Sequence, residues 1–367
     1  MISAADHEFM ARALQLARRG LYTTTPNPRV GCVIVKDGAV VGEGWHESAG
    51  GPHAEIIALK AAVGSVKNSA RDATLYVTLE PCHHHGRTPP CDEAAIAAGI
   101  KRVVIAMWDP DPRTAGQGIE RLRQAGIEVE TGAIEAEARE LNNGFVSRLT
   151  RGRPWVRVKL AASLDGKTAL NNGSSRWITG NAARCDGHHW RARACAVLTG
   201  IGTVRADDPW LTVREVATTR QPLRVVVDSH LAIAPAARIL EGGGVMVVCA
   251  QGDSAKAARL RSEGVEVIAL PNSQGRVDLP ALLNELARRG INELHVEAGA
   301  TLSGALLGIN GVDELLLYFS PCVLGDGARD MFVLPSLNNL GARHNLKIND
   351  VRAVGGDLRI LARVEQK

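Results

Sequence analysis

Two short segments of the sequence bring together the residue types that bind a catalytic metal. His53 and Glu55 stand two positions apart in a Pro-His-Ala-Glu string, and Cys82 and Cys91 follow further along beside prolines. Two thiolates and one imidazole are ligands that zinc prefers, and three protein ligands leave the fourth corner of the tetrahedron open for water. The pattern therefore predicts a catalytic zinc site.

Glu55 gives the open position a use. Zinc lowers the pKa of a bound water towards about 7, and a carboxylate that is not a ligand can carry protons between water and substrate. His-x-Glu followed by Pro-Cys-x-x-Cys is the signature of zinc-dependent base deaminases, and here six additional residues separate the two cysteines. The alternative is a structural zinc site with His83, His84 or His85 as fourth ligand, but such a site has no role for Glu55.

The composition indicates a two-domain protein of the cytoplasm. The chain has 367 residues, 45% of them hydrophobic and 22% charged, and this length favours two domains. No apolar run approaches the roughly eighteen residues of a membrane span, so we expect no membrane partner. The amphipathic N-terminus differs from a signal peptide. Seven cysteines, an odd number, suit a reducing compartment.

The charge does not indicate a nucleic-acid partner. Lys and Arg number 43 against 39 Asp and Glu, for a net charge of +4, and aromatic residues make up only 4%. The basic residues form no single stripe, and few aromatic side chains are present to stack on single-stranded bases. A small anionic ligand fits this composition at least as well.

Alternating helix and strand signals predict an α/β fold in both halves of the chain. In the first half we expect helices over 6–19, 53–62, 91–98, 118–124 and 135–149, and strands over 30–35, 39–44, 73–79, 102–107 and 127–131. In the second half we expect strands over 155–162, 196–199, 223–228, 245–250, 265–269, 293–296, 314–320 and 358–364, and a helix over 279–289. A linker over 150–154 would separate domains 1–150 and 151–367.

With the spacing between the two cysteines counted, the sequence resembles the riboflavin-biosynthesis deaminase–reductases. The first half carries the strings Thr25-Pro-Asn-Pro-Arg-Val-Gly31, Pro-His53-Ala-Glu55, Glu80-Pro-Cys82 and Thr-Pro-Pro-Cys91. The second half carries Lys159-Leu-Ala-Ala-Ser163-Leu-Asp-Gly166, Ser175-Arg-Trp177, Ala206-Asp-Asp-Pro-Trp-Leu211-Thr-Val-Arg214 and Glu297-Ala-Gly299. Several motifs in one order, over nearly the whole chain, are more specific than any one of them.

The resemblance implies a cytidine-deaminase-like α/β/α domain followed by a dihydrofolate-reductase-like α/β domain. It implies two consecutive reactions on a phosphorylated pyrimidine. The first hydrolyses the 2-amino group of a 2,5-diamino-6-ribosylamino-pyrimidinone 5′-phosphate. The second uses NADPH to reduce the ribosyl chain to ribityl, giving 5-amino-6-(5-phosphoribitylamino)uracil. We also expect a homo-oligomer formed through the reductase domain.

The resemblance also implies site residues. By the family's pattern His53, Cys82 and Cys91 bind zinc (Zn2+), and Glu55 is the proton shuttle. Contacts to NADPH fall on Ala161, Trp177, Thr203, Asp207, Ser229, Gly299, Ala300, Thr301, Leu302, Ser303, Gly304 and Ala305. Substrate contacts fall on Ser175, Arg191, Leu211, Arg214 and Glu297.

General chemistry agrees with these assignments in outline. Arg191 and Arg214 offer planar forks for a phosphate, although as isolated residues each would more often be a solvated surface charge. The run 299–305 offers a small-residue turn and a helix N-terminus for pyrophosphate, although alone it is more often a helix cap. It lacks the Gly-x-Gly-x-x-Gly spacing, so a Rossmann fold is not indicated. Trp177 alone would be taken for a core or interface residue.

Two positions depart from the family's usual residues. His83 stands where many relatives have Ser, and Asp111 stands where the family usually has Asn. Asp111 would either alter a substrate hydrogen bond or hold a turn, and the turn is favoured.

Two other functional classes compete with the enzyme. One is a nucleic-acid deaminase, which needs a basic stripe, and the other is a scaffold stabilised by zinc and without activity, which leaves Glu55 unexplained.

Overall fold

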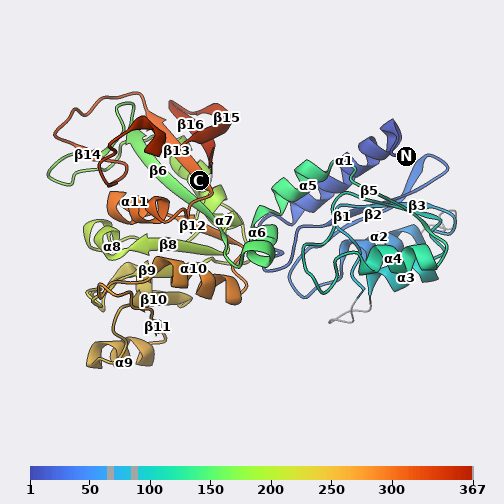
Figure 1. The fold of residues 1–367 in the computed structure, drawn as a ribbon, viewed down its shortest axis with the longest axis horizontal. Helices are drawn as coiled ribbons and strands as arrows, with labels where there is room; N and C mark the ends of the chain where they lie inside the picture. The colour runs from blue at the N-terminus through green and yellow to red at the C-terminus, as the bar shows by residue number, and fades with distance from the viewer. Residues whose placement is uncertain (64–69, 84–89, 366–367) are drawn as a thin grey trace. The chain divides into compact units, whose positions relative to one another are not determined.

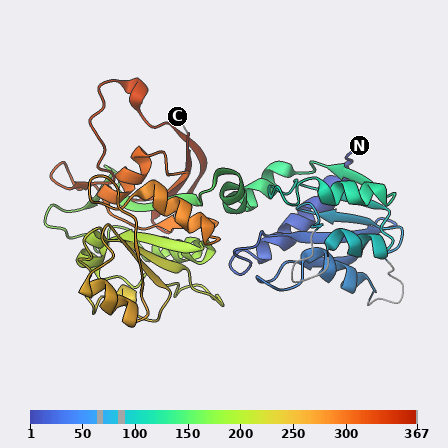
Figure 2. The ribbon, with the colours of Figure 1, turned by 60° about the horizontal axis from the view of Figure 1, so that its bottom comes forward.

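The computed structural model describes residues 1–63, 70–83 and 90–365. It divides into two compact units, Met1–Gly152 and Arg153–Lys367, each of which contains one large sheet with its own helices (Figures 1 and 2).

The first unit is a five-stranded sheet between two layers of helices. The strand order is β2-β1-β3-β4-β5, with β1 and β2 antiparallel and β3, β4 and β5 parallel. Figure 1 shows α1 and α5 over one face and α2, α3 and α4 over the other. The bounds are β1 Gly31–Lys36, β2 Ala39–Trp45, β3 Thr74–Val77, β4 Arg102–Ile105, β5 Glu128–Thr131, α1 Ala4–Arg19, α2 Ala54–Val63, α3 Cys91–Ala97, α4 Gln117–Gln124, α5 Glu135–Leu141 and α6 Asn143–Arg151.

Local sequence explains how β1, β2 and α2 come together. Asp37 and Gly38 join the two strands with φ of 50° and 77°, the left-handed pair that a two-residue hairpin turn requires. Strand β2 then carries glycine where α2 lies against it. A Cβ added to Gly44 would lie 2.5 Å from the Ala54 carbonyl oxygen. Glycine therefore allows the first turn of α2 to rest directly on the sheet.

The expected single helix over 135–149 is wrong, because the chain forms two helices that meet at Asn142. The buried Asn142 side chain accepts a hydrogen bond from Arg29 N at 2.8 Å and donates one to Arg29 O at 2.9 Å. These bonds hold Asn142 at φ −114° and ψ 21°, outside the helical range. The second of the two helices continues to Arg151 and ends at Gly152, so the start of the expected linker is helical.

The second unit is built on a nine-stranded sheet in the order β11-β10-β9-β8-β12-β6-β13-β16-β15. The strands from β11 to β13 run parallel, and β16 and β15 are antiparallel additions at one edge. The bounds are β6 Trp155–Ser163, β7 Lys167–Ala169, β8 Ala196–Gly200, β9 Leu223–Val227, β10 Val245–Cys249, β11 Glu266–Ala269, β12 Glu293–Val296, β13 Glu314–Ser320, β14 Arg329–Asp330, β15 Leu346–Val354 and β16 Asp357–Val364. The helices are α7 Asn181–Arg193, α8 Ile201–Asp207, α9 Ala255–Ser262, α10 Leu279–Arg288 and α11 Ala300–Gly308.

Alternate residues of the parallel strands are buried on opposite faces of this sheet. In β10, Met246 and Val248 join the apolar cluster that also contains residues of α10 and α11, the orange helices of Figure 2. Val245 and Val247 join the cluster that also contains residues of α9. A strand buried on both faces appears as a continuous apolar run, which is why the sequence predicted the central strands well.

Buried charges fix helix α7 to this sheet. Arg157 on β6 lies 2% exposed between Glu293 and Glu314 of the neighbouring strands, at 3.2 and 2.5 Å. Arg193, the last residue of α7, donates to the same Glu293 at 2.7 Å. The Arg157 guanidinium also stacks on the ring of Trp190, 4.5 Å from its centroid. Removing one member would leave an uncompensated buried charge, which is strongly destabilising.

Candidate functional site

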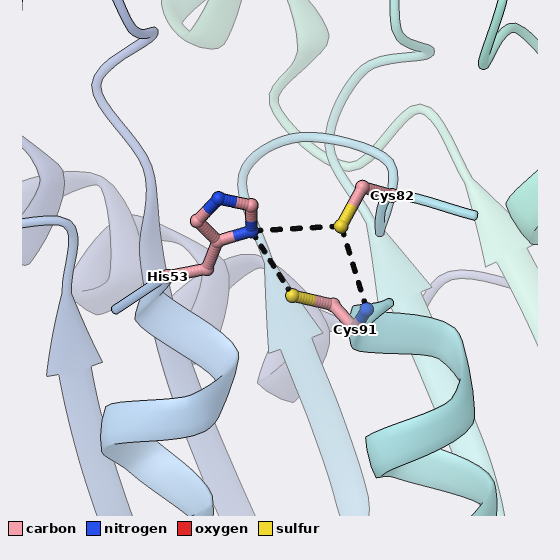
Figure 3. A group of neighbouring side chains, drawn as sticks. All are labelled: His53, Cys82 and Cys91. Atoms are coloured by element: carbon pink, nitrogen blue, oxygen red, sulfur yellow. Dashed lines mark hydrogen bonds between the residues drawn. The ribbon is translucent and has the colours of Figure 1, made fainter. Parts of the chain in front are cut away.

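The three predicted zinc ligands meet in the first unit. His53 immediately precedes α2, Cys82 lies in the loop after β3, and Cys91 is the first residue of α3. Figure 3 shows their side chains pointing toward one another, with His53 Nδ1 3.2 Å from the Cys91 sulfur and 3.5 Å from the Cys82 sulfur. The three ligand atoms lie within 4.8 Å of one another. Two sulfurs and one imidazole nitrogen form a donor set that fits zinc with one open position.

The electrostatics of the three side chains also suit a cation. The hydrogen bond from Cys91 lowers the pKa of Cys82 to about 4, with help from His53. The same hydrogen bond and burial raise the pKa of Cys91, and Cys82 raises the pKa of His53. A thiolate, a thiol and an imidazole thus share protons among atoms that lie within 4.8 Å of one another. A metal bound here replaces those protons, because cysteine and histidine ligate in their deprotonated forms.

Glu55 lies in the first turn of α2 next to this cluster and is only 4% exposed. Burial raises its pKa to about 7, and the nearby charge of Cys82 acts in the same direction. A carboxyl group with a pKa near neutrality can both accept and donate a proton at working pH. The structure therefore places a carboxyl group suited to proton transfer beside the cluster, and its role as the shuttle stays a prediction.

Two carboxylates contact the segments around the His53, Cys82 and Cys91 cluster, and the sequence assigned a role to neither. Glu80, at the end of the segment that follows β3, accepts hydrogen bonds from the backbone N–H groups of Asp109, Gly116 and Ile119 at 3.2, 3.0 and 3.3 Å. Asp92 is fully buried and contacts His83 Nδ1 at 2.6 Å. Since His83 follows Cys82 and Asp92 follows Cys91, this contact joins the chain next to one candidate ligand to the chain next to the other.

Asp111 holds a turn, as the sequence analysis favoured. Its carboxylate accepts from the backbone N–H and the Nε of Arg113, both at 3.0 Å. Its carbonyl oxygen accepts from Thr114 N and Ala115 N.

His46 and Asn27 form a further contact near the cluster, to which the sequence had assigned no role. The ring of His46 meets that of His53 edge-on at 5.7 Å and binds the Asn27 amide at 3.0 Å. The Thr-Pro-Asn-Pro string was the available signal.

In the second unit, several predicted residues gather at the carboxyl ends of adjacent parallel strands. Ser229 follows β9, Thr203 lies on the helix that follows β8, and Glu297 and Gly299 follow β12. Strands β9, β8 and β12 are neighbours in the sheet. Ligands of open parallel sheets bind at this edge. A Cβ added to Gly299 would lie 3.9 Å from the Thr203 hydroxyl, so two of the predicted cofactor contacts are close together.

The rest of the predicted cofactor set lies around these strands. Ala161 is within β6, and residues 300–305 form the first turns of α11. Gly304 is explained by packing, because an added Cβ would lie 2.1 Å from the Val333 carbonyl oxygen. Asp207 ends α8 and lies 3.8 Å from Arg176. Trp177 is 69% exposed and stacks with the Arg184 guanidinium at 4.5 Å, so it is not a core residue of its own unit.

The predicted substrate residues fall into different environments. Arg191 donates to both carboxylate oxygens of Glu297, at 2.7 and 3.0 Å, and to Thr212 O at 2.6 Å. Arg214 is exposed and lies over the Trp210 ring at 5.4 Å. Leu211 is buried in the apolar cluster on the α9 side of the sheet, and Ser175 is partly exposed before α7. The fork of Arg191 is thus already occupied by protein groups.

Lys159 is a functional candidate that the sequence analysis did not single out. Burial lowers its pKa, whereas Glu297 acts in the opposite direction. His295, fully buried on β12, lies with Nε2 3.5 Å from the same Glu297 carboxylate. The signal was a lysine between the buried residues Val158 and Leu160 of one strand, because Lys is mostly exposed in proteins.

The fold and the two clusters define a two-domain enzyme, with a zinc-type deaminase site in one domain and a parallel-sheet ligand site in the other. Residues 3–107 match the family model of the cytidine and deoxycytidylate deaminase zinc-binding region, and residues 154–360 match the RibD C-terminal domain. The chain belongs to the RibD family of bifunctional riboflavin-biosynthesis deaminase–reductases. The predicted fold class and the predicted pair of activities are therefore confirmed.

The relatives cover the chain from end to end. It is 48% identical to riboflavin biosynthesis protein RibD of Escherichia coli K12, over 96% of this chain and 98% of that protein. It is 42% identical to the RibD of Aquifex aeolicus, over 98% of each. Among solved structures, Acinetobacter baumannii RibD superposes with a TM-score of 0.91 at 43% identity, covering 99% of both chains. These families support zinc and a nicotinamide cofactor in general terms. No helix in the described part of the chain combines the length and apolar character needed to cross a bilayer.

We expect Cys82→Ala to lose zinc, because it removes one of the two sulfur atoms that face His53. Metal analysis of the purified protein should then find less than one equivalent per chain. Cys322→Ala, which removes a free cysteine of the second unit, is the control and should keep the metal. Stoichiometric zinc in the Cys82 variant would contradict the ligand assignment.

Proposed function

We propose that the first unit removes the 2-amino group of 2,5-diamino-6-ribosylamino-pyrimidinone 5′-phosphate by hydrolysis. We propose that the second unit then uses NADPH to reduce the ribosyl chain, giving 5-amino-6-(5-phosphoribitylamino)uracil. A Thermotoga maritima structure, with a TM-score of 0.87 and 35% identity, is described as a diaminohydroxyphosphoribosylaminopyrimidine deaminase and 5-amino-6-(5-phosphoribosylamino)uracil reductase. The observation that carries the deaminase proposal is the buried Glu55 beside the His53, Cys82 and Cys91 cluster.

In the deaminase site, His53, Cys82 and Cys91 would hold the metal and Glu55 would move protons. Zinc, when bound, supplies an activated water at neutral pH. Glu55 takes up the proton of the attacking water and gives a proton to the departing amino nitrogen, which leaves as ammonia. A carboxyl group whose pKa burial raises to about 7 can perform both transfers. The buried first turn of α2 holds that carboxyl group in place.

In the reductase site, we infer that the carboxyl ends of β9, β8, β12 and β6 receive NADPH. Ala161, Thr203, Asp207, Ser229, Trp177 and the run 299–305 would contact it. The substrate would lie toward Glu297, Arg191 and Arg214, with Ser175 and Leu211 beside it. Support comes from adjacent strand ends, which carry Ser229, Thr203 and Gly299 side by side. Arg214, an exposed guanidinium, supplies a fork for the anionic group.

We expect Glu55→Gln to abolish ammonia release while zinc and NADPH-dependent reduction are retained. Glutamine has nearly the same shape but cannot accept and return a proton. General acid–base groups contribute about 10²–10⁴-fold to rate, so deamination should fall by that factor. Ammonia assay and metal analysis of the same preparation provide the measurement. A variant within a few fold of the unmodified enzyme would rule Glu55 out as the shuttle.

We also infer that the two activities divide at the boundary between residues 150 and 153. Residues 153–367 expressed alone should bind NADPH and reduce the deaminated substrate, because both sheet and strand-end residues lie within that unit. Circular dichroism and NADPH fluorescence check the result. A folded fragment that does not bind NADPH would show that the cofactor site needs the first unit or that the assigned residues are wrong.

A homo-oligomer through the reductase domain is a further part of the proposal. Strand β15 forms one edge of the nine-stranded sheet and exposes Leu346, Ile348 and Val351 by 43%, 60% and 52%. An exposed apolar edge strand is a template for pairing with another chain. We expect Ile348→Lys to lower the solution mass by light scattering, whereas Val323→Lys, at another exposed apolar position, should not. An unchanged mass in the first variant would exclude this edge as the interface.

We place the enzyme in the cytoplasm. None of the seven cysteines forms a disulfide in the structure, as is usual in a reducing compartment. Fractionation of cells that produce the protein tests this placement, and recovery outside the cytoplasmic fraction would contradict it.

A further inference from the structure

The segment that carries two of the proposed substrate residues has no secondary structure to hold it. Residues 208–222, between α8 and β9, form neither helix nor strand. Leu211 and Arg214 lie on this segment, and Leu211 has a φ of 53°, in the left-handed region that non-glycine residues rarely adopt. A backbone of this kind keeps one conformation only when the surrounding groups determine it.

Side chains fix the conformation of this loop by forming hydrogen bonds with successive backbone groups. Arg191 Nη1 donates to Thr212 O at 2.6 Å. The Gln221 amide binds both polar groups of Val213, accepting from its N–H at 2.8 Å and donating to its carbonyl oxygen at 3.1 Å. The next N–H, that of Arg214, donates to His188 Nδ1 at 3.2 Å. Four consecutive polar groups of the loop are therefore paired with side chains.

Helix α7 is the platform for these contacts. His188 and Arg191 lie one turn apart on it, and both are buried, with 8% and 9% exposure. The loop is attached a second time, because Arg220 donates to the carbonyl oxygens of Ala192 and Ala194, at 3.0 and 2.9 Å, where the helix ends. Helix α7 is in turn fixed to the sheet by the contact between Arg193 and Glu293.

The chemistry of His188 suits an acceptor. Burial lowers its pKa to about 4, and the positive charges of Arg191, Arg214 and Lys159 act in the same direction, while Glu297 acts against them. At neutral pH the ring is therefore uncharged. Because Nδ1 accepts the Arg214 N–H, the ring proton is on Nε2. A protonated ring would have no lone pair at Nδ1 for this bond.

We propose that His188 and Gln221 are positioning residues of the reductase substrate site. They hold residues 211–214 in the one conformation that presents the Arg214 guanidinium to the anionic group of the substrate. Neither residue needs to touch the substrate, since each acts through the backbone of the loop. This inference rests on the proposed role of Arg214 in binding the substrate.

The test uses the full-length enzyme and the deaminated substrate, 5-amino-6-(5-phosphoribosylamino)uracil. His188→Leu and Gln221→Met keep the approximate volume and remove the hydrogen bonds. Each lost bond should raise the substrate KM about tenfold, with a smaller change in kcat. His188→Asn is the matched control, because its amide oxygen restores an acceptor near Nδ1, and it should stay close to the unmodified enzyme. The NADPH KM should remain within twofold, which also shows that the domain is folded.

A double-mutant cycle with Arg214→Ala separates the possible failures. If His188 and Gln221 act through Arg214, their effects on KM should largely disappear in the Arg214→Ala background, as coupled residues require. Effects that persist in that background, or a KM that does not rise in the single variants while Arg214→Ala raises it, would overturn the positioning role. A substrate KM that Arg214→Ala leaves unchanged would instead overturn the proposed role of Arg214.

Discussion

Where a parallel strand ends, the backbone loses its ladder of hydrogen bonds, and its polar groups must find other partners. Both candidate sites of this protein lie in such regions. In each, the loops that carry functional residues are held by side chains that bind backbone N–H and C=O groups. An unpaired buried N–H or C=O is costly, so these side chains restrict the loops to few conformations. The need to pair these groups thus shapes both sites.

In the first unit, one carboxylate pairs several of these backbone N–H groups. Glu80 stands two residues before the ligand Cys82 and binds three backbone N–H groups of the segment from Asp109 to Ile119. The same segment also packs against Pro81, because a Cβ added to Gly118 would lie 2.1 Å from the Pro81 carbonyl oxygen. The start of α4 is therefore packed against the loop that carries the candidate metal ligand Cys82. A shift of either element would move the other.

How much could be predicted from the sequence follows from the range of the interactions involved. The proximity of His53, Cys82 and Cys91 was predictable, because each lies beside a strand or helix whose pattern is local, whereas their roles stay predictions. The hairpin at Asp37 and Gly38 was predictable for the same reason. The break at Asn142 was not, because its cause is a pair of hydrogen bonds to Arg29, far away in sequence.

Other omissions have physical causes of their own. Strand β15 was missed because its apolar alternation changes phase: Leu346 and Ile348 alternate with polar residues, but the register shifts between Ile348 and Asp350, so Val351 is out of phase with them. His188 and Gln221 were missed because their partners are backbone groups. Almost every residue has a backbone N–H and a carbonyl group, so no sequence motif indicates these contacts. Such positioning residues become visible only when the loop and its platform are seen together.

Arg191 and Arg214 show what the structure adds to two residues that the sequence treats alike. Arg191 is buried and forms a bidentate ion pair with Glu297. Burial alone would raise the pKa of Glu297, but Arg191, His295 and Lys159 hold it well below its usual range, so the carboxylate stays charged. The charge of Arg191 is therefore balanced within the protein, and its third contact supports the loop at Thr212. Arg214 forms no such pair with Glu297 and remains exposed at the surface of the loop. Of two identical side chains, one is neutralised by a buried carboxylate, and the other keeps an exposed guanidinium, which is why the proposed contact with the substrate anion is assigned to Arg214.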